Sequence, residues 1–202
     1  MTLEEALIEI RSFWPSDEAL PFVGTTVDRL ERLQQEFGEE FPDDLRQYLL
    51  LAAPRTRCAF EQIGNPVSLY GVEDLSPMID GYSFNPNDGK PIDDWSRSWF
   101  LLGDEGADPR IVDLADATTP LPVLGAMHGQ GAWDFGPVAS SLAQYLLVVA
   151  GIHRALTMNF LHILDDENGF TLNEEAADWL FPRVRRWAPE YYDDWLSVFD
   201  NA

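Results

Sequence analysis

The sequence has a single cysteine, Cys58, among its 202 residues. One cysteine cannot form an intramolecular disulfide, and no paired-cysteine pattern of a zinc site is present. Such cysteine usage is typical of a reducing compartment. The hydrophobic content of 46% is enough for the chain to bury a core. One domain with an appendage fits this length better than two equal domains.

Long hydrophobic runs are also missing. The longest mostly apolar run, Tyr145–Gly151, is far too short to span a bilayer. The first ten residues are acidic and amphipathic, whereas a secretion signal has a basic start followed by an apolar block. We therefore expect a cytoplasmic protein that has no contact with a membrane.

Basic residues are few, because 13 Lys and Arg stand against 35 Asp and Glu, for a net charge of -22. Such a surface repels phosphate groups, which disfavours binding to nucleic acids or anionic membranes and favours a basic partner. Residues 58–137 are the most acidic part, with 13 acids and 3 bases. High negative charge also serves solubility alone, so the charge leaves both explanations open.

Motifs of catalysis are absent as well. The sequence has no Gly-x-Ser-x-Gly elbow and no phosphate-binding glycine loop followed by lysine. His153 and His162 fall in or at the end of a predicted helix, where we expect satisfied imidazoles. His128 is followed by Gly129 and Gly131, in a catalytic loop or in a tight turn. We expect no enzymatic activity, catalytic residue, metal or cofactor, with a hydrolase or metal enzyme using His128 as the minor alternative.

Helical spacing of apolar residues occurs at both ends of the chain. It predicts three amino-terminal helices, a helix that covers a sheet, and short helices near the carboxyl end. These are residues 1–14, a helix from a cap at Thr25 or Thr26 to Gly38, one between Pro42 and Pro54, then Val138–Phe160, Asn173–Leu180 and Pro189–Phe199. We expect residues 1–160 to form one domain, with 161–202 as an aromatic, acidic, helical extension docked on it.

Short apolar runs separated by glycines and prolines fill the middle of the chain and are typical of strands. The candidate strands are Val67–Tyr70, Trp99–Leu102, Arg110–Leu114, Leu121–Leu124 and Ala132–Phe135. The second and third of these flank Gly103-Asp104-Glu105-Gly106 and predict a central hairpin, with either Trp99 and Leu101 or Phe100 and Leu102 facing the core. The segment Tyr82–Pro91 is too polar and broken for a strand, so we expect a long exposed loop, often a functional feature.

Four acids cluster around the predicted hairpin: Asp104, Glu105, Asp108 and Asp113. Converging carboxylates can bind a divalent cation, but this spacing matches no calcium loop. Asp is also a residue that turns require, which favours a structural role for Asp104. Glu105 and Asp108 are needed less by the turn and are better candidates for contact with a partner.

Two blocks of the chain follow the pattern of a known family. The first comprises Glu36-Phe37-Gly38, Phe41-Pro42-Asp43-Asp44-Leu45 and Tyr48-Leu49. The second comprises the hairpin of residues 99–114, followed by His128-Gly129, Trp133 and Val138-Ala139-Ser140-Ser141-Leu142. Over about residues 25–155 the chain thus resembles the SUKH superfamily (Smi/Knr-like), which includes many bacterial immunity proteins and yeast cell-wall regulators. It departs from the family pattern at Phe41, Leu45 and Ala107.

The resemblance implies an α+β fold: amino-terminal helices packed beside a mixed, curved sheet of about five or six strands, with a covering helix. It also implies an immunity protein that neutralises a cognate toxin, such as a polymorphic or type VI secretion effector, by covering its active cleft. The net charge favours a basic, nucleic-acid-targeting toxin domain. The alternative is a non-catalytic interaction or scaffold protein of the same superfamily. We expect a monomer when the protein is free.

Candidate toxin-binding residues come from the exposed loop, the hairpin and the glycine turn. They are Tyr82, Phe84, Asp88, Asp93, Asp94, Glu105, Asp108, Trp133 and Asp134. We expect the acids to steer a basic toxin and the aromatic rings to hold it. The competing explanation is that the rings are buried packing and the acids a solvated face. A second candidate region is the carboxy-terminal extension around Trp187, Tyr191 and Trp195.

Overall fold

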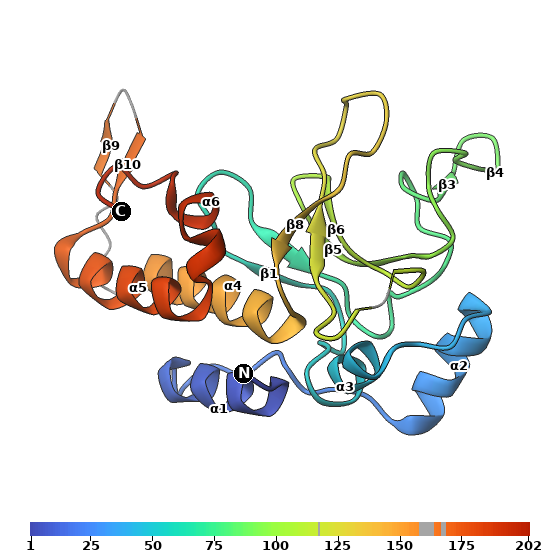
Figure 1. Ribbon diagram of the computed structural model, residues 1–202, viewed down its shortest axis with the longest axis horizontal. Coiled ribbons are helices and arrows are strands. Elements are labelled where there is room, and N and C mark those ends of the chain that lie inside the picture. The colour runs from blue at the N-terminus through green and yellow to red at the C-terminus, as the bar shows by residue number, and fades with distance from the viewer. Residues whose placement is uncertain (117, 158–163, 167–168) are drawn as a thin grey trace.

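The computed structural model describes residues 1–116, 118–157, 164–166 and 169–202, and its architecture is α+β (Figure 1). A six-stranded sheet is combined with amino-terminal helices, a covering helix and carboxy-terminal helices, as predicted. The β3–β4 hairpin (Phe84–Asn85 and Lys90–Pro91) lies at one end of the long axis, and the carboxy-terminal helices lie toward the other (Figure 1).

The main sheet has the strand order β1-β2-β5-β6-β7-β8. Its strands are β1 (Cys58–Phe60), β2 (Val67–Leu69), β5 (Trp99–Glu105), β6 (Asp108–Asp113), β7 (Val123–Gly125) and β8 (Gly136–Ala139). The pairing of the predicted central hairpin is confirmed, because Phe100 pairs with Val112 and Leu101 with Ile111. Its predicted turn, Gly103–Gly106, is wrong, because β5 continues to Glu105 and the turn is Gly106-Ala107, both with positive φ. Each pair of neighbouring strands in this sheet runs antiparallel, whereas a mixed sheet was expected.

Several strand predictions are wrong in position. The last strand is Gly136–Ala139 and not Ala132–Phe135, because the rings of Trp133 and Phe135 pack against Trp95 outside the sheet. The Tyr82–Pro91 segment contains β3 and β4, whose turn includes Gly89 at φ 71°. The structure adds β1 and a small hairpin of β9 (Leu164–Asp166) and β10 (Gly169–Thr171).

The three amino-terminal helices form where the sequence predicts them. They are α1 (Leu3–Phe13), α2 (Val27–Phe37) and α3 (Asp43–Leu51). Thr2 caps α1 and forms a capping box with Glu5. Thr26 caps α2, and Gly38 ends it in the left-handed conformation at φ 71°.

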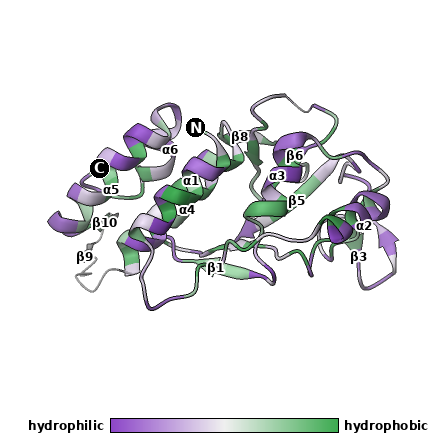
Figure 2. Ribbon diagram, turned by 90° about the horizontal axis from the view of Figure 1, so that it is seen from below, coloured by the Kyte–Doolittle hydropathy of each residue, from purple (hydrophilic) through white to green (hydrophobic). Residues whose placement is uncertain are grey.

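The covering helix α4 (Leu142–Thr157) is the most hydrophobic helix and contacts both α1 and α5 (Glu174–Trp187). Figure 2 shows the hydrophobic residues that run along it. It starts later than predicted, because Val138 and Ala139 belong to β8; the predicted end at Phe160 is outside the described residues. Among the described helices, none has the length and apolar composition needed to cross a membrane.

The carboxy-terminal helices pack on the rest of the chain. Helix α5 continues past the predicted end at Leu180 to Trp187, with Pro182 inside it. A 3₁₀ turn (Pro189–Tyr191) and α6 (Tyr192–Leu196) follow. Glu9 of α1 accepts hydrogen bonds from Arg186 and, at 3.0 Å, from the indole N–H of Trp187. The end of α5 is therefore tied to the first helix.

Strand β5 is covered on both faces. The Phe100 ring packs against Phe37 and Phe41, with centroid distances of 4.9 and 5.3 Å, whereas Trp99 packs against Phe135 at 4.6 Å. A register shift between Leu101 and Gly103 interrupts the alternation. Phe100, Leu101 and Leu102 are consequently all buried, so the prediction that only one alternating pair faces the core is wrong.

Asp104 is the one buried charged residue in the described part of the chain, at 7% exposure. Its carboxylate accepts a hydrogen bond from the Tyr70 hydroxyl at 2.6 Å. Arg57 Nη2 donates to both carboxylate oxygens at 3.0 and 2.9 Å, and its guanidinium lies over the Tyr70 ring. Asp104 is thus structural, as predicted, but it acts within β5 and links distant segments, which a turn residue would not do.

Replacing Arg57 tests this buried contact. We expect Arg57→Met to lower the free energy of unfolding by about 1–3 kcal/mol, because Asp104 keeps only its Tyr70 partner and Arg57 is partly solvated. The matched control is Arg55→Met, which removes the exposed ion pair with Glu73. Urea unfolding should show no measurable change for the control. Equal stability of both variants would show that the Asp104 contact contributes nothing.

Truncating the central strand tests the packing of β5. Phe100 is fully buried between Phe37 and Phe41, so Phe100→Ala should lower the free energy of unfolding by about 3–5 kcal/mol. Met127→Ala, at a side chain that is 66% exposed, should stay within about 0.5 kcal/mol of wild type. A loss below about 1 kcal/mol for Phe100→Ala would contradict the position of β5 in the core.

Candidate functional site

Five aromatic rings form a cluster on the face of β5 opposite to Phe100. This aromatic cluster consists of Tyr82, Trp95, Trp99, Trp133 and Phe135. Trp95 is its centre, with ring centroids 5.4 Å from Tyr82, 5.4 Å from Trp99 and 5.9 Å from Trp133. Every ring except Tyr82 is partly exposed. Most of these contacts are edge-to-face or tilted, which favours ordered packing of the rings.

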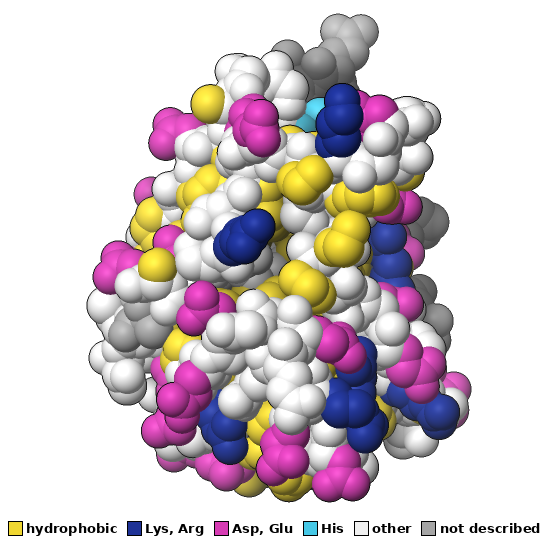
Figure 3. Space-filling view, turned by 90° about the vertical axis from the view of Figure 1, so that its right-hand side faces the viewer, with side chains coloured by type: hydrophobic (Ala, Val, Ile, Leu, Met, Phe, Trp, Pro, Cys, Tyr) yellow, Lys and Arg dark blue, Asp and Glu magenta, His cyan; other side chains and the backbone are white. Residues whose placement is uncertain are grey.

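An apolar cavity of about 350 Å³ lies beside the aromatic cluster. Its walls come from α2, the β3–β4 hairpin with its flanking loops, and the start of β5. Most of the lining side chains are apolar, among them Phe37, Met78, Phe84, Ile92, Trp95 and Trp99, and the polar ones are Glu36, Ser83, Ser96 and Arg97. Figure 3 shows this end of the molecule, where hydrophobic side chains gather in the upper half with Lys or Arg among them, and acidic side chains lie toward the margins and in the lower half. Partly exposed rings beside an apolar cavity are typical of a binding surface.

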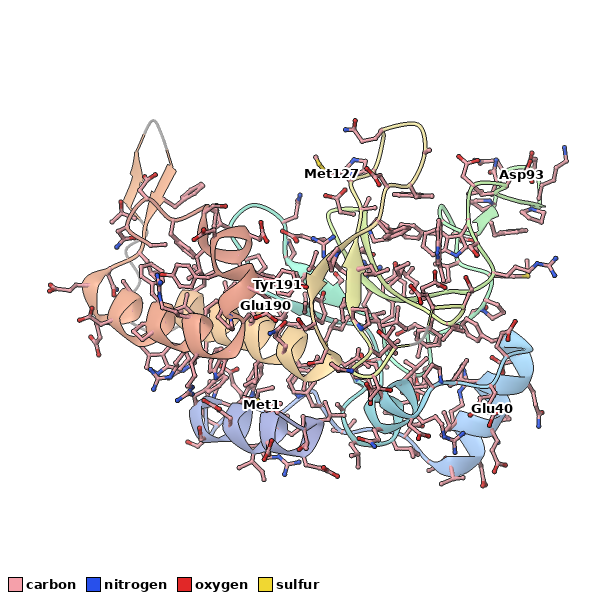
Figure 4. All side chains as sticks on the ribbon, viewed as in Figure 1. Met1, Glu40, Asp93, Met127, Glu190 and Tyr191 are labelled. Atoms are coloured by element: carbon pink, nitrogen blue, oxygen red, sulfur yellow. The ribbon has the colours of Figure 1, made fainter. Side chains whose placement is uncertain are left out.

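Exposed acids surround the rings. Asp88 lies in the turn between β3 and β4, Asp93 and Asp94 precede Trp95, and Asp134 follows Trp133. Figure 4 shows Asp93 and Met127 on the same upper edge of the molecule. The aromatic cluster, these four acids and Phe84 are called the aromatic-acidic surface below.

The structure brings Trp133 into the aromatic cluster and places Phe84 in the wall of the cavity beside it. Phe84 and Trp133 are partly exposed, and Asp88, Asp93, Asp94 and Asp134 are exposed. Tyr82 also belongs to the aromatic cluster, but the prediction that it is exposed is wrong. Its side chain is only 7% exposed, because the ring packs against Trp95 and the hydroxyl donates to the carbonyl of Ala107 at 3.1 Å.

Two predicted acids are occupied within the protein. Glu105 accepts a hydrogen bond from Arg110 Nη2 at 2.5 Å. Asp108 accepts from the His128 backbone N–H at 2.7 Å and contacts His128 Nδ1 at 2.6 Å. Both acids therefore hold parts of the sheet and its loops. The prediction that they are free to contact a partner is wrong.

Trp95, Trp99 and Phe135 belong to the surface but were not among the predicted site residues. Trp99 and Phe135 were assigned to strands, where a large ring is ordinary core. Trp95 follows Asp93-Asp94 in a segment otherwise rich in polar residues. A bulky ring in such a segment is a signal of contact, and it identifies Trp95 without a structure.

The four hairpin acids do not converge on a common point. Asp104 binds Tyr70 and Arg57, Glu105 binds Arg110, and Asp113 accepts the N–H of Ala115 at 3.0 Å. Among the described residues, no group of three or more His, Cys, Asp or Glu side chains is arranged to bind a metal ion. The glycines beside His128 have positive φ, at Gly129 and Gly131, as a tight turn requires.

A larger cavity of about 510 Å³ lies between the sheet and α6. The Glu105–Arg110 pair forms part of its lining, so two of its charges compensate each other. Trp195 also lines it and donates its indole N–H to the Val138 carbonyl at 2.9 Å. Trp187 is 4% exposed. These rings attach the carboxy-terminal extension, which leaves the aromatic-acidic surface as the better candidate site.

Comparisons with known proteins add no relative. No protein-family model matches the chain, and no curated protein matches it in sequence. The resemblance to the SUKH superfamily therefore stays a prediction from the two sequence blocks.

His153 is a satisfied imidazole, as predicted; His162 is outside the described residues. The Nδ1 atom of His153 accepts a hydrogen bond from the backbone N–H of Glu61 at 2.9 Å, and the His153 ring stacks on Trp14. Burial lowers the pKa of His153, with a smaller contribution of Arg154 in the same direction, and Glu61 and Glu18 oppose this.

This lowered pKa predicts a pH dependence of stability. The unfolded chain binds the proton more readily than the folded one, so stability is retained above pH 6.5 and lost as the pH falls below it. We expect His153→Asn, which keeps an acceptor near the position of Nδ1, to remove up to about 1.4 kcal/mol per pH unit of this slope. Urea unfolding at pH 7.5, 6.5 and 5.5 measures it, and parallel curves for both proteins would contradict the prediction.

Proposed function

We propose that this protein is a cytoplasmic immunity protein that binds and neutralises a cognate bacterial toxin through the aromatic-acidic surface. The observation that carries the proposal is the partly exposed ring cluster, which borders an apolar cavity and is surrounded by exposed acids. Protein interfaces have this composition, with aromatic residues at the centre and polar residues at the rim. The two SUKH-like sequence blocks support the same function.

The charge favours a basic toxin. The protein carries a net charge of -22, and the acids nearest to the rings are exposed. A nuclease or nucleic-acid deaminase domain has a basic cleft for its substrate, and an acidic protein is attracted to that cleft. In this proposal the protein covers the cleft and catalyses no reaction itself.

Neutralising the acids of the surface tests the proposal. The partner is the toxin domain encoded beside this gene, and the variant is Asp88→Asn/Asp93→Asn/Asp94→Asn. We expect its association rate at low salt to fall on the order of tenfold and to depend less on salt, because electrostatic steering is weakened. The dissociation rate should change less than about twofold. Surface plasmon resonance over a series of salt concentrations measures both rates.

The matched control removes the same charge elsewhere. Glu174→Gln/Glu175→Gln/Asp178→Asn changes three exposed acids of α5, far from the aromatic-acidic surface. Its association rate should fall by less than about threefold, since only the net charge changes. Equal loss in both variants contradicts the proposed surface. Absence of binding by the wild type, or binding that does not protect cells from the toxin, contradicts neutralisation, and the latter supports the scaffold alternative.

A further inference from the structure

We infer that the apolar cavity beside Trp95 receives one bulky apolar side chain, which the toxin presents on a basic segment. This inference rests on the proposed function, since it names the part of the toxin that the aromatic-acidic surface holds. A volume of about 350 Å³ is at the low end of ligand pockets, which span roughly 300–1,000 Å³. Such a space fits a single large side chain better than an extended ligand.

The walls of the cavity select an apolar occupant. Phe37, Phe84, Ile92 and Trp99 contribute rings and an aliphatic chain from separate segments of the fold. An apolar side chain that enters loses contact with water and gains contact with these groups. Anchors of this kind, buried in a pocket at the centre of an interface, carry most of the binding energy in many complexes.

Three of the four polar side chains in the walls are already bonded, and the fourth, Arg97, is exposed to solvent. Ser83 Oγ donates to the Pro77 carbonyl at 2.8 Å and accepts the N–H of Ile79 at 2.7 Å. Ser96 Oγ is 2.9 Å from Ser98 Oγ, and Glu36 is paired with Arg29 at 2.9 Å. A polar side chain of the toxin would lose its water without gaining these groups as partners.

Met78 lines the cavity although its side chain is 60% exposed. Methionine is flexible and polarizable, so it adapts its shape to an occupant. An exposed methionine beside an apolar cavity gains burial when the cavity is filled, and Met78 therefore provides a variant that changes the cavity without disturbing the core.

The charges around the cavity favour a basic segment as the carrier of this side chain. Asp93 and Asp94 lie between Ile92 and Trp95, which both line the cavity, and Arg97 is the basic residue of the lining. A second copy of this chain is disfavoured as the occupant, because a symmetric contact brings the same acids face to face. A toxin segment with lysine or arginine beside the apolar side chain meets the acids favourably.

Changing Met78 tests the inference. With the toxin domain encoded beside this gene, Met78→Gln should raise the dissociation rate about five- to tenfold, which corresponds to about 1–1.4 kcal/mol. The association rate should stay within about twofold, because the charge is unchanged. Met127→Gln is the matched control, since Met127 is 66% exposed and does not line this cavity. Its dissociation rate should stay within about twofold of wild type.

A second measurement needs no toxin. Indole, the analogue of a tryptophan side chain, is titrated at millimolar concentrations into protein with ¹⁵N-labelled tryptophan. We expect the indole N–H resonances of Trp95 and Trp99 to shift and that of Trp187 to stay in place. Butylammonium, the analogue of a lysine side chain, should leave all three unchanged.

These measurements separate the inference from the proposed function. If the wild type does not bind the toxin, the proposed function fails, whatever indole does. If the wild type binds and Met78→Gln dissociates at the same rate, the cavity is not the receptor. A response of Trp95 and Trp99 to butylammonium and not to indole also overturns the inference. So does a wild-type dimer that Met78→Gln dissociates, because a second copy would then occupy the cavity.

Discussion

The hydrogen bonds from Arg57 and Tyr70 to the buried carboxylate of Asp104 determine how the sheet begins. A buried charge is strongly unfavourable without partners, so the segment before β1 and the end of β2 must close on β5. Gly103 permits the close approach, because a Cβ atom there would lie 2.0 Å from the Ser68 carbonyl oxygen. The compensated charge of Asp104 and the absence of a side chain at Gly103 thus act at neighbouring positions of β5.

The same strand separates the core from the aromatic-acidic surface. Phe100 points toward the amino-terminal helices, and Trp99 points toward the loops that carry Trp95 and Phe135. The hairpin acids stabilise this arrangement, since Glu105 holds Arg110 and Asp108 holds the loop at His128. The loops that form the surface are therefore positioned by a rigid element, although they contain little regular structure of their own.

The parts of the fold that depend on local sequence could be predicted. The cap at Thr26, the end of α2 at Gly38 and the apolar spacing of α1 and α2 act within a few residues. The three-residue strand β1 carries too short a pattern, and its pairing with β2 is a contact between separate segments. The shift of the last strand to β8 follows from the packing of Trp133 and Phe135 against Trp95, which no local pattern shows.

The candidate site was also predictable only where it depends on local sequence. A loop with Phe84, Asp88, Asp93 and Asp94 shows its polarity in the sequence, and these residues do lie at the surface. The burial of Tyr82 depends on Ala107, which lies 25 residues away, and the occupation of Asp104 depends on Arg57 at a separation of 47 residues. Sequence alone gives the chemical type of these side chains, whereas their partners are fixed only by the folded chain.

The contact of Glu9 with Arg186 and Trp187 joins the first helix to the end of α5. These partners are separated by nearly the whole chain, so during translation α1 emerges long before the residues that complete its contacts are made. Before that point α1 can pack on α3 and α4, which are made earlier, but its Glu9 side chain lacks these two partners. The attachment of α5 to α1 is therefore completed only when synthesis is almost finished, and a truncation before residue 186 removes both partners of Glu9.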